Sequence, residues 1–220
     1  MGVLKTTNFG NPHIGLFARA SERMVAADAS ASPKFFASLG QFGADIFPAS
    51  FGASGLVGVF LAMNSNGAVV PSFTDAAEIS ELKRRGLNIA TLPGRFSAAG
   101  NNISANDFGA VANPAIPTES IRKISDCLGV EVVPRAVAGY LTAGSCLLAT
   151  NKGFLAHNRA GEEELKELQS ILHVGGTNST LNAGVAFVSI CAIANSRAAL
   201  VGEASTGFEV GRAAGELGFV

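Results

Sequence analysis

Cysteine and histidine are the residues of this chain that could serve as a nucleophile, a general base or a metal ligand, and there are three of each. A cysteine attacks as a thiolate and needs a base beside it. The absence of a C-x-x-C pair argues against a zinc knuckle, and the odd number of cysteines argues against a disulfide framework. We therefore expect no metal, no cofactor and a reducing compartment, the cytoplasm. The residues concerned are Cys127, Cys146, Cys191, His13, His157 and His173.

Other motifs of catalysis are also missing from the sequence. It contains no Walker A loop, no G-x-S-x-G elbow and no G-x-G-x-x-G after a strand. Cys191 lies within the apolar run 184–194, where a thiolate would be costly. We therefore interpret Cys191 as a small buried core residue.

The composition excludes several classes of protein. Of 220 residues, 48% are apolar and 15% are charged, and 16 Lys+Arg stand against 17 Asp+Glu for a net charge of −1. Such a chain can form a core and is neither disordered nor a broadly basic nucleic-acid-binding protein. Its longest apolar run, 184–194, falls short of the ~20 residues of a membrane-spanning helix. We expect a globular monomer that binds neither membranes nor free DNA.

An asparagine-centred turn followed by small and branched apolar residues recurs along the chain. Clear copies begin at Asn64, Asn106, Asn151 and Asn195, and a weaker copy begins at Ser21. These anchors are 43, 42, 45 and 44 residues apart, and five such units fill the chain. We place the repeats at about 1–48, 49–92, 93–135, 136–174 and 175–220 within a single domain, 1–220.

An apolar stripe at a constant distance from the anchors supports this repeat. One apolar residue stands fifteen positions after each anchor, or fourteen in the fourth unit, and another stands three positions further on. The i, i+3 spacing predicts one amphipathic helix in each unit, and Asp75 with Glu78 is typical of a capping box at such a helix start. The stripe consists of Phe36, Ile79, Ile121, Leu165 and Val210, followed by Leu39, Leu82, Ile124, Leu168 and Ala213.

The apolar segments around the turns predict strands. Residues 56–63 and 185–193 are β-branched, aromatic and nearly free of charge, so we predict strands buried on both faces. A second strand follows each turn, and a third often follows the helix, as at 87–91 and 130–133. Such units must pack side by side, and neither end of the chain is polar enough to cap an open stack. We predict an α/β fold, a closed ring with five-fold pseudosymmetry, inner strands and outer helices.

Several motifs resemble those of archaeal and eukaryotic translation initiation factor 6, a family of ribosome anti-association factors. The resemblance covers nearly the whole chain and implies the pentein fold, a five-fold α/β propeller that agrees with the ring expected from the repeats. Its motifs are Asn11-Pro12-His13-Ile14-Gly15, Gly55-Leu56-Val57-Gly58, Thr150 to His157, and Ile193 to Gly202 leading into Ser205-Thr206-Gly207-Phe208-Glu209.

The resemblance implies a function on the ribosome. The family binds the large ribosomal subunit, prevents its premature association with the small subunit, and takes part in large-subunit biogenesis. The implied contact is a ribosomal protein at the subunit interface close to the sarcin-ricin loop. A translocase-like GTPase and an adaptor protein are the implied partners for release.

The turns are the candidate binding residues. Symmetry places equivalent turns of a ring on one face, so Asn64, Asn106, Asn151 and Asn195 should share it. The resemblance implies that Asn106, Asn151 and Asn195 contact the subunit. The neighbouring residues Arg23, Asn66, Asp107, Lys152 and Arg197 would flank them. Because Glu22 and Asp107 offset the cations of this face, a contact dominated by protein fits better than one dominated by RNA.

An enzyme is the competing interpretation. Pentein rings also occur in guanidine-modifying hydrolases and transferases. These enzymes resemble one another in using a cysteine nucleophile late in the chain and a His-x-Asp pair. Cys191 is late in the chain, but none of the three histidines is followed two positions later by aspartate. A nucleophile without its base is not a catalyst, so we expect a binding protein without enzymatic activity.

Overall fold

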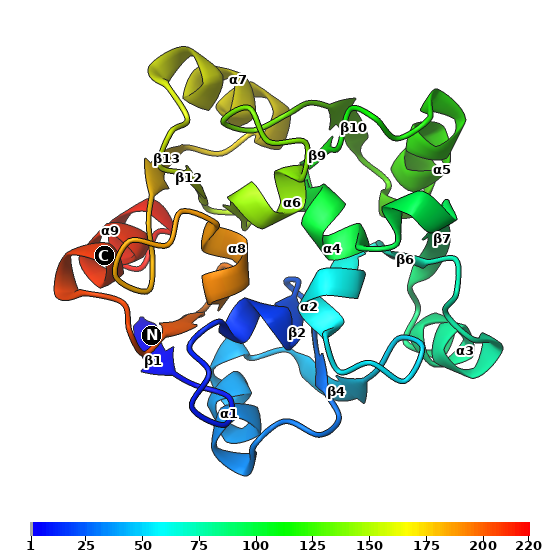
Figure 1. Cartoon of the computed structure of the whole chain (residues 1–220), viewed down its shortest axis with the longest axis horizontal. Coiled ribbons are helices and arrows are strands. Elements are labelled where there is room, and N and C mark those ends of the chain that lie inside the picture. Colours follow the sequence, from blue (N-terminus) through cyan, green and yellow to red (C-terminus); the bar gives the residue numbers. More distant parts are fainter. Residues whose placement is uncertain (1) are drawn as a thin grey trace.

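The computed structural model describes residues 2–220 and arranges them as a ring of five three-stranded sheets (Figure 1). In each sheet the inner strand is antiparallel to the central strand, and the outer strand is parallel to the central one. The sheets are β2 (Ala18–Ala20), β3 (Met24–Asp28) and β4 (Asp45–Ala49); β5 (Ala62–Met63), β6 (Gly67–Pro71) and β7 (Asn88–Leu92); β8 (Ile103–Ala105), β9 (Gly109–Ala112) and β10 (Glu131–Pro134); β11 (Leu147–Ala149), β12 (Phe154–His157) and β13 (Gly176–Ser179); and β14 (Ala192–Ala194), β15 (Ala199–Gly202) and β1 (Val3–Thr6). The predicted α/β propeller is confirmed.

The fifth sheet contains strands from both ends of the chain. β1 runs parallel to β15 with Val3 opposite Ala199, and so takes the place that the third strand of a unit occupies elsewhere. The predicted first repeat, 1–48, therefore contains a strand of the fifth unit. The predicted boundary at 174 is wrong as well, because β13 follows it and pairs with β12 in the fourth sheet. The terminal units meet through this shared sheet, with the two termini near each other in Figure 1.

One longer helix per unit lies on the outside of the ring, as the apolar stripe predicts (Figure 1). The Asp75–Glu78 capping box is present at the start of the second of them. Leu39 falls in a 3₁₀ turn, Leu39–Phe42, that directly follows the first helix. The outer helices are α1 (Pro33–Ser38), α3 (Ala76–Arg84), α5 (Thr118–Leu128), α7 (Glu162–Leu172) and α9 (Gly207–Glu216).

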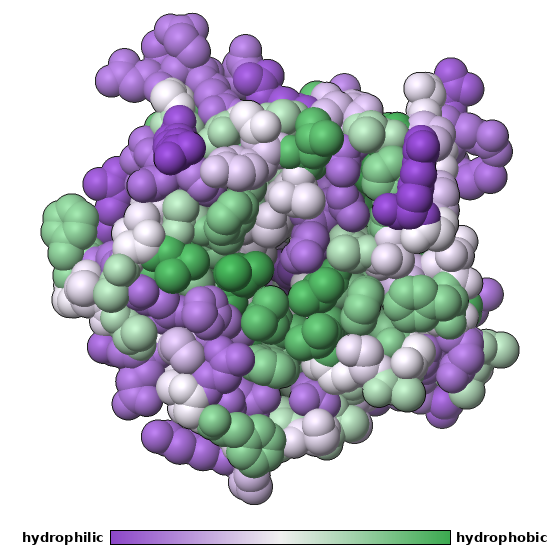
Figure 2. Space-filling view, in the orientation of Figure 1, coloured by the Kyte–Doolittle hydropathy of each residue, from purple (hydrophilic) through white to green (hydrophobic). Residues whose placement is uncertain are grey.

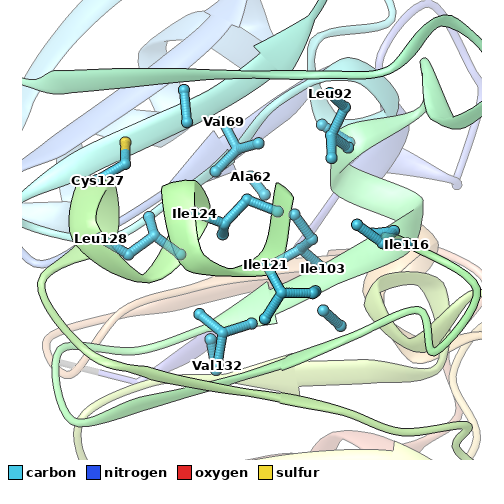
Figure 3. Packing of buried hydrophobic residues seen from close by; sticks show 14 of the residues in the cluster. Ala62, Val69, Leu92, Ile103, Ile116, Ile121, Ile124, Cys127, Leu128 and Val132 are labelled. Carbon is cyan, nitrogen blue, oxygen red and sulfur yellow. The ribbon is translucent and has the colours of Figure 1, made fainter. Parts of the chain in front are cut away.

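Each outer helix packs against the sheet of the preceding unit as well as its own. Figure 3 shows Ile124 of α5 on the side of Val69 and Leu92 of the second sheet, and Ile121 beside Val132 of β10 in its own unit. The equivalent cluster at the ring closure joins Phe35 and Leu39 of the first unit to Leu200 and its neighbours in the fifth sheet. Five such clusters form the core, and each lies at a seam between units. Removing a side chain such as Ile124 would cost about 2–5 kcal/mol of the free energy of unfolding.

The two long strands predicted before the turns are only partly strand. Residues 57–60 and 188–191 form single helical turns, and strands of two or three residues follow them. These turns surround the axis of the ring on one face (Figure 1), and apolar residues gather around the axis on that face (Figure 2). A Cβ on Gly58 would overlap the carbonyl oxygen of Gly15, so the ring of turns closes only because glycine lies there. The inner turns are the 3₁₀ turn Ile14–Leu16, α2 (Val57–Phe60), α4 (Ala99–Asn102), α6 (Ala143–Cys146) and α8 (Val188–Cys191); a further 3₁₀ turn spans Gly94–Phe96.

No helix within residues 2–220 is both long enough and apolar enough to cross a bilayer.

Candidate functional site

The turns between the inner and central strands of all five units meet around the axis and form one surface, the turn face. A small depression at its centre is lined by residues of every turn, including Ser21, Asn64, Asn106, Thr150 and Asn195. The expectation that the turns share one face is confirmed by this shared lining.

The first residue of each turn holds the turn closed with its side-chain oxygen. In Asn64, Oδ1 accepts from the backbone N–H groups of Asn66 and Gly67 at 3.0 and 3.1 Å. In the fourth unit this acceptor is Oγ1 of Thr150, at 3.1 Å from the N–H of Lys152. The predicted anchor Asn151 is therefore wrong by one residue, because a hydroxyl closes the turn as an amide oxygen does. With Thr150 as the anchor, Leu165 stands at fifteen positions like its equivalents.

The asparagines at the first position also join neighbouring units. Nδ2 of Asn64 donates to the carbonyl oxygen of Asn106 in the next turn and to that of Leu128 at the end of the next outer helix, at 3.1 and 2.8 Å. Asn106 and Asn195 make the same pair of bonds across their seams. The side chains of Asn64, Asn106 and Asn195 are 1%, 4% and 1% exposed. The structure assigns them to turns and seams, which removes them from the surface that a partner could touch.

A second layer of contacts links the second residues of the turns. Both carboxylate oxygens of Asp107 accept from Ser65, one from its N–H at 2.8 Å and the other from its hydroxyl at 2.7 Å. Asn151 in turn accepts from the N–H of Asp107 and donates to its carboxylate. Asp107 and Asn151 are half-buried by these contacts, so they stiffen the turn face as well as contribute to it.

The seam between the fifth and first units uses charged groups. Glu22 accepts from the N–H and the hydroxyl of Ser196 at 2.9 and 2.8 Å. Arg197 donates from Nε to the carbonyl oxygen of Phe42 at 2.8 Å and from its guanidinium to that of Glu22. Arg197, predicted as a contact residue, is half-buried in this seam.

Four side chains project from the turn face. Arg23, Asn66 and Lys152 are exposed, as predicted for contact residues. Lys152 makes no side-chain hydrogen bond or ion pair with any of residues 2–220, so its ammonium group is available to a partner. Phe108, which the sequence analysis missed, is 46% exposed beside Asp107. The sequence feature that could have identified it is an aromatic residue at the third turn position, where the other copies carry Arg, Asn or Lys.

Arg19 joins three of the inner turns by hydrogen bonds from one side chain. Its guanidinium donates to the carbonyl oxygens of Gly58, Leu61 and Gly100 at 2.5, 3.2 and 3.2 Å and to Oγ of Ser189 at 2.8 Å. A cavity of only about 20 Å³ is lined by Arg19 and by residues of all five inner strands. Burial lowers the pKa of Arg19 to about 10, which leaves it charged at neutral pH. Its only sequence signal was an arginine between two alanines of an inner strand.

The enzymatic alternative depends on Cys191, which is fully buried in the seam core of the fourth and fifth units. Burial raises the pKa of its thiol to about 12, so a thiolate does not form at neutral pH. His157 is buried against Tyr140 and Phe187, with ring centres 4.9 and 5.3 Å away. Residues 2–220 also hold no group of three His, Cys, Asp or Glu side chains arranged to bind a metal.

Comparison with known proteins adds to this geometry. The sequence model of the eIF-6 family matches residues 3–215. Translation initiation factor 6 of Haloquadratum walsbyi is 32% identical over 228 residues, which cover 99% of this chain and 97% of that protein. The protein of the same name from Thermococcus onnurineus is 32% identical over the full length of both chains. That of Picrophilus torridus is 39% identical over 168 residues, 76% of this chain and 77% of that protein.

Proposed function

Because this chain belongs to the eIF-6 family, we propose that it binds the large ribosomal subunit through the turn face and prevents that subunit from joining the small one prematurely. The observation that carries the proposal is the exposure of Arg23, Asn66, Phe108 and Lys152 on turns that are hydrogen-bonded to one another. A rigid surface loses little entropy on docking, and steric occlusion requires no chemistry.

The charges of the turn face favour a protein partner over bare RNA. Arg23, Lys152 and Arg197 are accompanied by Glu22 and Asp107, so few phosphates could be neutralised. An exposed aromatic residue beside mixed charges is typical of protein interfaces. We propose a ribosomal protein at the subunit interface, close to the sarcin-ricin loop, as the principal contact. About 800 Å² of surface on each partner would suffice.

We also propose a role in large-subunit biogenesis through the same surface. A factor that covers the interface keeps an immature large subunit out of translation and must later be removed. We propose that removal requires a translocase-like GTPase with its adaptor and that the protein acts as a monomer in the cytoplasm. No enzymatic activity is proposed, in keeping with the relatives' name of translation initiation factor.

The test is co-sedimentation of the purified chain with separated ribosomal subunits, followed by a subunit-joining assay. Selective binding to the large subunit with inhibited joining is the expected result. A variant with both Phe108→Ala and Lys152→Ala should lose binding, whereas Lys166→Ala on the exposed outside of α7 should keep it. Equal binding of the wild type to both subunits, or to neither, would overturn the proposal.

A further inference from the structure

We propose that the outer edge of β7 binds an extended segment of a partner protein, which pairs with it as an added β-strand. A groove of about 690 Å³ runs along β7 and is bounded on its other side by α5. Its walls include Asn88, Thr91 and Leu92 of β7 and Lys123 and Asp126 of α5. Figure 1 shows β7 at the rim of the ring between α3 and α5. This proposal depends on β7 alone and stands apart from the function proposed for the turn face.

The main chain of β7 presents free hydrogen-bonding groups to the groove. β7 pairs in parallel with β6, and the N–H of Asn88 donates to the carbonyl oxygen of Asn66 at 3.0 Å. Alternate residues of a paired strand point their N–H and C=O groups to opposite sides, so those of Ile89 and Thr91 point away from β6. Such an unpaired row is a template for another strand.

The other four units provide an internal comparison. The strand registers place Thr91 opposite Val70, and the equivalent outer positions are opposite Ala27, Ala112, Ala156 and Val201. The residues at these positions differ in each unit. They are Pro48 in β4, Pro134 in β10, Asn178 in β13 and Lys5 in β1.

Each of these four residues opposes the addition of a strand. Pro48 and Pro134 have no N–H to donate, and proline is a residue that protects edge strands from pairing. Lys5 is exposed, and an edge lysine has the same protective effect. Asn178 is covered by Arg212, which donates to its Oδ1 at 3.2 Å and to Thr177 at 2.7 Å. Among the five outer edges of residues 2–220, only that of β7 has at this position an exposed residue that is neither proline nor lysine and that no other side chain covers.

The groove beside β7 is also less obstructed than the grooves beside β4 and β10. Beside β4 the groove measures about 220 Å³. At its end the carboxylate of Glu78 accepts hydrogen bonds from the hydroxyl of Ser50 and from the N–H of Gly52. Between β10 and α7 the gap is spanned by the ion pair of Arg135 and Glu167. Beside β7, by contrast, Lys123 pairs within its own helix, with Glu119.

The charges of the groove indicate what the bound segment would carry. The thiol of Cys127 donates to the carbonyl oxygen of Asn88 at 3.2 Å, so the C-terminal end of α5 lies at the start of β7. Asp126 therefore lies near Asn88, and Lys123 lies further along β7. An extended segment with a basic side chain near Asp126 and an acidic side chain near Lys123 matches this wall.

Thr91→Pro is the decisive variant, because it gives β7 the residue that β4 and β10 carry at the same position. The outward N–H of Thr91 has no partner in residues 2–220, so the substitution removes no internal hydrogen bond. Thr91→Val is the matched control, because it keeps the N–H and a β-branched side chain. Both variants should unfold at the same denaturant concentration as the wild type.

The probe is a phage-displayed library of random decapeptides, selected on the full-length chain. Selected peptides should bind the wild type and Thr91→Val equally and Thr91→Pro about tenfold more weakly, the effect of losing one well-made hydrogen bond. They should shift the NMR signals of the Ile89 and Thr91 amides, and N-methylation of alternate peptide residues should abolish binding. The proposal is overturned if no peptide is recovered or if every recovered peptide binds Thr91→Pro as tightly as the wild type. A dimer of the chain itself that Thr91→Pro dissociates would also overturn it, because the occupant would then be a second copy.

Discussion

Nδ2 of Asn195 lies 3.2 Å from the carbonyl oxygen of Phe42, so one side-chain hydrogen bond joins the last turn of the chain to the end of the first unit's 3₁₀ turn. The same Nδ2 reaches the carbonyl oxygen of Ser21. Together with the pairing of β1 and β15, this bond closes the ring. The seam between the terminal units is therefore built like the internal seams, where Asn64 and Asn106 make equivalent bonds.

Asn195→Ser separates the two roles of this residue. Serine can still accept from the turn N–H groups, as Ser21 does in the first unit, but it is too short to donate across the seam. We expect the free energy of unfolding to fall by about 1–3 kcal/mol, because two buried carbonyl groups lose a partner. Urea denaturation measures the change, with Asn158→Ser, a change at an exposed asparagine, as the control. An unchanged midpoint would show that the seam does not depend on Asn195.

Asn106→Ala should lower stability, whereas Lys152→Ala should lower binding. Asn106 is buried and bonded to Thr150 and Leu172, so its loss should lower the free energy of unfolding by about 1–3 kcal/mol. Lys152 is exposed, so its loss should leave stability within about 0.5 kcal/mol and weaken binding to the large subunit. Thermal unfolding and co-sedimentation are the two measurements. Normal stability of Asn106→Ala would contradict the structural role given to the asparagines.

Arg19→Lys should not behave as a conservative change. The guanidinium reaches three carbonyl oxygens and Ser189 from different directions, whereas an ammonium group is a single point charge. We expect a loss of about 2–4 kcal/mol in the free energy of unfolding, because buried carbonyl groups are left unpaired. Denaturant unfolding measures it, and Arg84→Lys on the surface of α3 provides the control. A loss no larger than that of the control would mean that Arg19 is dispensable for the axial packing.

Glu209 should make stability depend on pH in the acid range. Burial alone would raise its pKa, but hydrogen bonds from Thr206, Thr180, Gly184 and Ala183 lower it to about 2. Since the pKa is lower in the folded state, its stabilising effect is complete above the ordinary value and is lost as the pH falls from about 4.5 toward 2. The amide in Glu209→Gln does not titrate.

The measurement for Glu209 is the melting temperature of wild type and Glu209→Gln as a function of pH. The difference between them should be largest near pH 7 and should shrink as the pH falls toward about 2. Because Glu209 is 4% exposed, we expect the free energies of unfolding of the two proteins to differ by roughly 2–3 kcal/mol at neutral pH. Parallel curves over this range would contradict the assignment.

Much of the turn face was predictable because its residues are local in the sequence. The turns repeat at a nearly constant spacing, and symmetry alone places them on one face. Exposed Arg23, Asn66 and Lys152 follow from their positions at the tips of these turns. Phe108 was missed because polarity was taken as the mark of a contact residue. The buried state of Asn64, Asn106 and Asn195 was missed because their partners come from the neighbouring units.

The sequence by itself determined the number of units, the outer helices and the positions of the turns, because these depend on local periodicity and turn chemistry. Only the tertiary structure decided what occurs between units. It turned residues 57–60 and 188–191 into helical turns, since glycines at the axis allow backbones to meet there. In the folded chain β1 pairs with β15 in the fifth sheet, and the outer edge of β7 pairs with no other strand of residues 2–220. These features depend on which surfaces meet when the ring closes, and the local sequence of one unit does not specify which residues of the adjacent units it will contact.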